Sequence, residues 1–217
     1  MKRNLLQICQ YIGNMPNSEL DTDIISISDV TDEQLNALNR SLLTIWGETV
    51  GRNMRLAKTN FNTEVGVSDY ALPSGNIIKN GVKLNGTLIP FVQDIEELAE
   101  RSGTPDRFTI QGDKLVFYPT PNAIMTVNLK YRTKYAVLTS ENVAKSTFAS
   151  GTDVLNISER IEDEFINCLG HLTNQLLNGK PTSKYYAEHE KRYITALQLL
   201  KMVDEGTEDS YPSISIG

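Results

Sequence analysis

The residues best suited to chemistry in this sequence are its two cysteines and two histidines. Cys168 and His171 are three positions apart, a spacing that places both side chains on one face of a helix. A zinc site needs three or four ligands, and the other two candidates, Cys9 and His189, stand elsewhere in the sequence. We therefore interpret Cys168 as a core residue with His171 at its border, and we predict no metal and no cofactor.

Two acidic clusters are the next candidates. One cluster contains Glu96, Glu97 and Glu100, and the other lies within residues 159–164. A glycosidase cleaves its substrate with two carboxyl groups. Both clusters fall on predicted helix surfaces or first turns, where carboxylates are solvated or interact with the helix dipole. The sequence has no nucleophile elbow and no zincin helix, so we predict that the protein is not an enzyme. A cell-wall glycan-cleaving enzyme is kept as the less favoured alternative.

A third candidate is a row of basic residues. Lys130, Arg132 and Lys134 alternate along one predicted strand, so they share one face. This face could contact an acidic partner or DNA. The commoner role of such charges is to protect the edge of a sheet against unwanted pairing.

The end of the chain carries apolar residues after an acidic stretch. Tyr211, Ile214 and Ile216 follow residues 205–210, and residues 213–216 alternate as a strand does. Exposed isoleucines on a free end are unusual in a monomer, whereas an extended end can join the sheet of a partner. We predict a docking segment here, with a disordered end as the alternative.

The bulk composition excludes several classes of protein. The chain has 217 residues, 40% of them hydrophobic and 22% charged, as in soluble globular proteins. No apolar run approaches the ~18 residues of a membrane span, and the N-terminus lacks a signal-peptide cleavage site, so we expect a protein made in a cytoplasm that does not bind membranes. A net charge of −6 argues against a protein that grips nucleic acid mainly through phosphates.

Helical patterns occupy both ends of the chain. Residues 1–51 predict two helices, one with Leu5, Ile8 and Ile12 on a single face, and one that begins at Thr31 with a capping box to Gln34. Residues 158–204 predict two longer helices, separated by Gly179 and the proline after it. Residues 205–217 form the predicted extended tail.

The middle of the chain has the patterns of strands. Residues 52–138 predict a β-rich subdomain with hairpins at Asn80-Gly81, Asn85-Gly86 and Gly112-Asp113, and a short helix over residues 94–101. Residues 139–157 show little periodicity and predict a connecting loop. The predicted fold is therefore α+β: a helical bundle built from both chain ends, with an inserted antiparallel β-rich subdomain and an extended C-terminal tail.

The middle region also carries a series of short motifs. In order along the chain they are Tyr70-Ala71-Leu72-Pro73, Gly103-Thr104-Pro105, Gly112-Asp113, Pro119-Thr120-Pro121 and a strand ending at Tyr131. This order, with helices on both sides, resembles the head-to-tail adaptor proteins of short-tailed bacteriophages, also called tail tubular protein A or portal adaptors. The resemblance covers most of the chain and departs from the family in the 139–157 loop and the extra N-terminal helix.

The resemblance implies a virion protein without enzymatic activity. Such adaptors form a ring, typically of about twelve copies, that connects the capsid portal to the tail nozzle and fibres. It implies subunit contacts through residues 159–177 and 183–203, portal docking through residues 211–217, and tail contacts through the sheet of residues 76–134. DNA would pass through the lumen without sequence-specific binding, at a head–tail junction assembled in the cytoplasm of the host bacterium. Another virion or tail module, such as a fibre-docking or head-completion protein, is the alternative.

Overall fold

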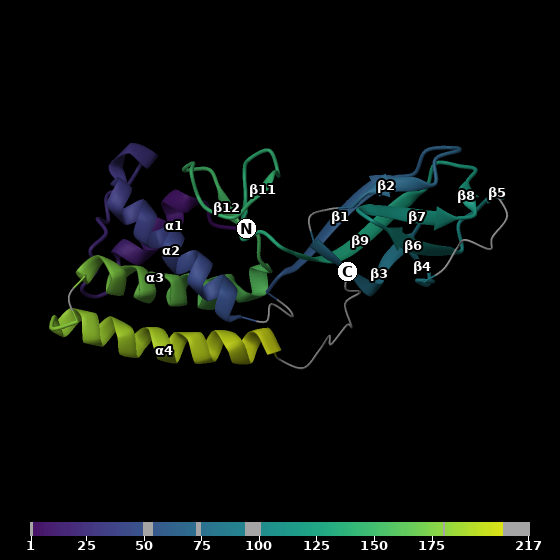
Figure 1. Cartoon of the computed structure of the whole chain (residues 1–217). Helices are drawn as coiled ribbons and strands as arrows, with labels where there is room; N and C mark the ends of the chain where they lie inside the picture. The colour runs from purple at the N-terminus through teal and green to yellow at the C-terminus, as the bar shows by residue number, and fades with distance from the viewer. Residues whose placement is uncertain (1, 50–53, 73–74, 94–100, 180, 206–217) are drawn as a thin grey trace. The chain divides into compact units, whose positions relative to one another are not determined.

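The computed structural model describes residues 2–49, 54–72, 75–93, 101–179 and 181–205 (Figure 1). These residues form two compact units. The helical unit contains the described parts of Met1–Arg55 and Tyr135–Glu208, and the sheet unit contains those of Leu56–Lys134. Since helices and antiparallel sheets occur together, the predicted α+β class is confirmed.

Helices from both ends of the chain build the helical unit. Helix α3 contacts α1, α2 and α4; the four helices are α1 (Leu5–Gly13), α2 (Asp32–Glu48), α3 (Glu162–Asn178) and α4 (Lys184–Glu205). Short 3₁₀ turns, η1 (Ile27–Asp29) and η2 (Glu159–Ile161), precede α2 and α3. The buried faces of the four helices share one apolar core, in which Leu5, Ile8 and Ile12 of α1 are fully buried, as predicted.

The helix ends follow from their capping residues. The Thr31 side chain accepts a hydrogen bond from the Gln34 N–H, and the Gln34 side chain accepts one from the Thr31 N–H, which is the predicted capping box. The sequence before α1 uses Asn4 and Gln7 in the same way. Helix α3 ends at Gly179 in the left-handed region, at a φ of 61°, where a residue without a Cβ is favoured.

The segment expected as a connecting loop, residues 139–157, contains two short strands. Strands β11 (Ala144–Lys145) and β12 (Val154–Leu155) pair with β10 (Val137–Leu138) on either side. Phe148 anchors the segment: it is buried, and its backbone exchanges two hydrogen bonds with the Asn39 side chain of α2. The buried Asp153 carboxylate accepts hydrogen bonds from Ala149 N and Ser150 N, each 2.7 Å long. The distant contact between Asn39 and Phe148 and the local hydrogen bonds of Asp153 therefore order this segment, although its composition predicts a loop.

The sheet unit consists mainly of two antiparallel sheets that share a core. One has the order β1-β9-β3-β4 and the other the order β2-β7-β6, while β5 and β8 form a short parallel pair. The strands are β1 (Leu56–Asn62), β2 (Asp69–Ala71), β3 (Gly75–Leu84), β4 (Thr87–Leu88), β5 (Ser102–Gly103), β6 (Arg107–Gln111), β7 (Lys114–Tyr118), β8 (Thr120–Pro121) and β9 (Thr126–Thr133). Apolar side chains from both sheets meet in that core, among them Ile77, Val127, Phe108 and Phe117.

Two of the three predicted hairpins are confirmed. Asn85 and Gly86, both at positive φ, join β3 to β4, and Gly112 joins β6 to β7 at a φ of 61°. The hairpin predicted at Asn80-Gly81 is wrong, because these residues lie inside β3, where the register to β9 shifts between Ile77 and Val82. A bulge uses the same residue types as a turn, so the dipeptide alone does not distinguish the two.

Two other predictions lie outside the described residues. Of the helix predicted over residues 94–101, only Arg101 is described, and it stands outside the helices and strands. Of the extended tail predicted over residues 205–217, only Glu205 is described, and it is the last residue of α4. Tyr211, Ile214 and Ile216 lie outside the described residues.

The chain leaves the helical unit and returns to it beside one segment. Ser158 N donates to Met54 O just before β1 (3.0 Å), and Asn156 N donates to Ala136 O just after β9 (2.7 Å). The Asn156 amide also donates to Tyr135 O (3.1 Å). Residues 156–158 therefore bind the residues of the helical unit that directly precede and follow the inserted segment.

Candidate functional site

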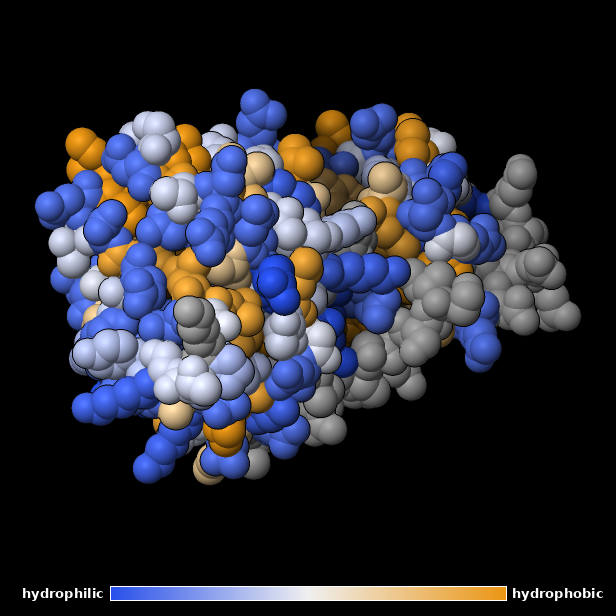
Figure 2. Space-filling view, turned by 60° about the vertical axis from the view of Figure 1, so that its left-hand side comes forward, coloured by the Kyte–Doolittle hydropathy of each residue, from blue (hydrophilic) through white to orange (hydrophobic). Residues whose placement is uncertain are grey.

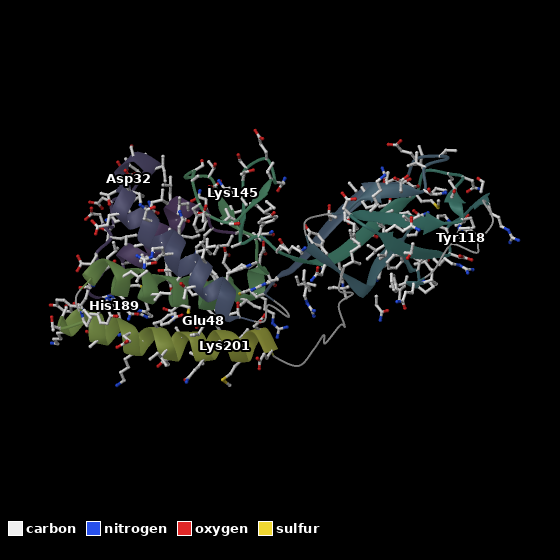
Figure 3. The ribbon with its side chains drawn as sticks, viewed as in Figure 1. Asp32, Glu48, Tyr118, Lys145, His189 and Lys201 are labelled. Atoms are coloured by element: carbon white, nitrogen blue, oxygen red, sulfur yellow. The ribbon has the colours of Figure 1, made fainter. Side chains whose placement is uncertain are left out.

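The two histidines, His171 of α3 and His189 of α4, lie against each other where these helices pack together. Figure 3 labels His189 on α4. Nδ1 of His171 is 3.3 Å from Nδ1 of His189, and both side chains are buried. Nε2 of His189 is 3.1 Å from the carbonyl oxygen of Asn17, which only accepts, so this nitrogen carries a proton and donates it to Asn17. Burial, with smaller contributions from His189 and Arg192, lowers the pKa of His171 to about 4. His171 is therefore neutral at neutral pH, and its contact with His189 joins two helices.

Both cysteines are core residues. Cys168 and Cys9 are fully buried, and burial raises the pKa of each thiol to about 12. Such thiols stay protonated and act as small apolar side chains, as interpreted for Cys168 from the sequence. Within the described ranges, no group of three or more His, Cys, Asp or Glu side chains is arranged to hold a metal ion.

The acidic cluster at the start of α3 binds the N-terminal segment. Glu162 is buried, and its carboxylate accepts a hydrogen bond of 2.8 Å from Arg3 N. Asp163 forms an ion pair of 2.5 Å with the Arg3 guanidinium. These carboxylates therefore join the first residues of the chain to α3. The other cluster, with Glu96, Glu97 and Glu100, lies outside the described residues.

The outer surface of the four-stranded sheet carries a group of basic and amide side chains, which we call the basic face. Because residues that pair across antiparallel strands share a face, the register places Lys58 opposite Lys130, and Arg132 between Leu56 and Asn76. The face comprises four cations and four amides: Lys58, Lys83, Lys130, Arg132, Asn60, Asn62, Asn76 and Asn128. The apolar residues of the same strands point to the opposite side and form the core.

A bulge and a hydrogen bond shape the basic face. The Asn128 amide donates to the Asn60 side-chain oxygen over 3.0 Å. Opposite Lys130, strand β3 bulges, and a Cβ on Gly81 would come within 2.5 Å of the Lys130 carbonyl oxygen. A groove of about 340 Å³ runs over the bulge, lined by Lys58, Asn60, Asn80, Gly81, Lys83, Asn128, Leu129 and Lys130.

The structure brings together only part of the predicted basic row. Lys130 and Arg132 share the basic face, whereas Lys134 follows the last residue of β9. The edge-strand interpretation is wrong, because β9 pairs with β1 on one side and β3 on the other. Lys58 and Lys83 were missed, since each joins the face only through the register. The alternation around Lys58 in β1 was the one signal that pointed to it.

Helix α4 presents apolar side chains to solvent as well as to the core. Ile194 and Leu199 are each 51% exposed, and Met202 is 70% exposed. Figure 2 shows hydrophobic patches among hydrophilic side chains on the visible surface. A groove of about 450 Å³ between α3 and α4 is lined by residues that include Asn167, His171, Arg192 and Leu199. Side chains of this kind suit a protein contact.

Contact surfaces of these kinds are typical of an interaction protein, and comparison with known families agrees. The family model of the SU10 adaptor protein matches residues 4–213, so the chain belongs to this family. It is a phage adaptor, a structural protein of the virion that acts by joining other virion proteins. No curated protein matches the chain. No helix in the described part of the chain is both long enough and apolar enough to cross a membrane.

Proposed function

We propose that this adaptor forms a closed ring between the capsid portal and the tail, through which DNA leaves the capsid. The observation that carries the proposal is the family match over nearly the whole chain. Head-to-tail contacts between identical chains close into a ring when the rotation divides a full turn. With about twelve copies, as the resemblance implies, 24.2-kDa chains would give a mass of about 290 kDa.

Contacts between neighbouring copies would involve the two C-terminal helices, residues 159–177 and 183–203. The exposed Ile194, Leu199 and Met202 of α4 support this assignment, because apolar side chains buried at a subunit contact are removed from water. The groove between α3 and α4 offers a recess next to these residues.

The other contacts would involve the tail and the sheet unit. Residues 211–217, with Tyr211, Ile214 and Ile216, would dock on the portal, and the sheet of residues 76–134 would meet the tail nozzle, another tail ring or the fibres. Lys130, Arg132 and Lys134 would contact the tail or the channel. Assembly would take place in the cytoplasm of the host bacterium, and the mature location would be the head–tail junction.

The test is to measure the mass and the negative-stain appearance of the purified protein, alone and mixed with the portal of its phage. A ring stacked on the portal supports the proposal and gives the copy number. A chain that ignores the portal contradicts it and favours another virion module, such as a fibre-docking or head-completion protein. Glycan cleavage that is lost on alanine replacement of Glu162 and Glu164 would favour the enzyme alternative.

A further inference from the structure

We propose that the basic face binds the phosphate backbone of duplex DNA, an inference that rests on the proposed function and assigns a partner to one of its surfaces. Two rows of side chains across the strands carry this inference. In one row Lys58 lies beside Lys130, so two ammonium groups are neighbours. In the next row Asn60 lies beside Asn128, and Asn128 lies beside the ammonium group of Lys83.

The charge of this face is opposite to that of the chain. The whole protein has a net charge of −6. The paired strand positions of the basic face, within the described residues, nevertheless carry four cations and no carboxylate. Cations concentrated on one surface of an acidic protein create a local positive potential that attracts an anion. The acidity of the whole chain, which argued against nucleic-acid binding, therefore does not describe this surface.

The types of side chain favour a nucleic acid over an acidic protein. Lys, Arg and Asn side chains are among the usual donors to phosphate oxygens. The centres of protein–protein contacts are instead enriched in aromatic residues and Met and depleted in Lys. The only apolar side chains at the paired positions of the face are Leu56 and Leu88, which lie at its opposite edges.

The backbone beneath the face holds these donors in a fixed pattern. Lys58 and Lys130 occupy directly opposed positions of neighbouring strands, so their side chains lie on the same face of the sheet. A hydrogen bond from the Asn128 side-chain amide to the Asn60 side-chain oxygen fixes the neighbouring row. Gly81, in the bulge, lines the groove together with Lys83 and Lys130. Because β9 is an interior strand, neighbouring strands hold it in place on both sides. Binding to the phosphate backbone of DNA needs no contact that reads the base sequence.

The experiment measures binding of the full-length protein to a fluorescently labelled DNA duplex of mixed sequence by anisotropy, from about 50 to 200 mM salt. One variant combines Lys58→Gln, Lys83→Gln and Lys130→Gln. The matched control combines Arg40→Gln, Arg101→Gln and Lys114→Gln, which changes the net charge equally, at exposed positions outside the basic face. Circular dichroism and the portal-binding assay are run on both variants.

We expect the first variant to bind DNA on the order of 10-fold more weakly than the control, with a salt dependence shallower by about 2–3 in log–log slope. Equal weakening by the control, or wild-type protein that binds no DNA, overturns the inference. It is also overturned if the variant keeps DNA binding but loses a tail partner, since the face would then bind protein. Failure of the wild-type protein to join the portal contradicts the ring adaptor instead, whatever the DNA result.

Discussion

The buried histidine pair predicts that the protein loses stability in mild acid. An unfolded histidine takes up a proton as the pH falls through about 6.5, whereas folded His171, with its pKa lowered to about 4, takes it up only near that pH. The unfolded state therefore binds more protons between these two values. The contribution of His171 to the free energy of unfolding is fully present above about pH 6.5. It falls as the pH decreases and is lost below about pH 4.

The size of the effect follows from the two pKa values. Their difference corresponds to about 3 kcal/mol over the whole interval, of which about 2 kcal/mol falls between pH 7 and pH 5. The groups that face His171 act in opposite directions: His189 and Arg192 oppose its protonation, and Glu188 favours it. Since burial is the largest cause, the effect should persist at high salt.

Urea unfolding of wild type and His171→Gln at pH 7 and pH 5 tests this reasoning. Glutamine has a side-chain amide that can donate to or accept from Nδ1 of His189, but it does not titrate. We expect the variant to lose about 2 kcal/mol less than wild type between the two pH values. Glu190→Gln, at an exposed position of the facing helix α4, serves as the control and should behave as wild type. An equal pH dependence in wild type and His171→Gln would refute the assignment.

Three further predictions concern other parts of the chain. Asp153→Asn should lower the free energy of unfolding by about 2 kcal/mol at pH 7, measured in urea, because the buried carboxylate accepts two backbone hydrogen bonds; its pKa is lowered despite burial, so the difference from wild type should shrink only as the pH falls below about 3.8. Gly81→Ala should cost about 1–3 kcal/mol in thermal or urea unfolding, since its Cβ would meet the Lys130 carbonyl. Gly47→Ala, a helical site with nothing within 4 Å, should be neutral or stabilising by up to about 1 kcal/mol, and equal losses at both glycines would contradict the close approach. Deletion of residues 211–217 should leave a folded protein that no longer binds the portal in a pull-down assay, and unchanged binding would exclude this segment as the docking site.

The helices could be predicted from the sequence because their signals are local. The capping box from Thr31 to Gln34, the buried stripe of α1 and the terminator Gly179 each lie within a few residues of the structure they determine. The tight turn at Asn85-Gly86 is equally local, because positive φ at both residues is a property of the dipeptide.

The features that were missed depend on residues far apart in the chain. Asn80-Gly81 became a bulge because β9 pairs with β3 on both sides of it. Lys58 reached the basic face through a partner that lies more than seventy positions later, Lys130. His171 and His189 met because α3 and α4 lie against each other. Register and helix packing decide such pairs, and composition and periodicity do not encode them directly.

The way the sheet unit joins the helical unit has an evolutionary consequence. Leu56 at the start of the sheet unit is paired with Arg132 near its end. The flanking residues Met54 and Ala136 accept backbone hydrogen bonds from residues within 156–158. A segment whose two ends lie side by side can be replaced by another of different length without rearranging the fold that receives it. This arrangement allows evolution to retain the helical unit and replace the inserted sheet unit. One adaptor fold can thereby be adapted to different partner proteins.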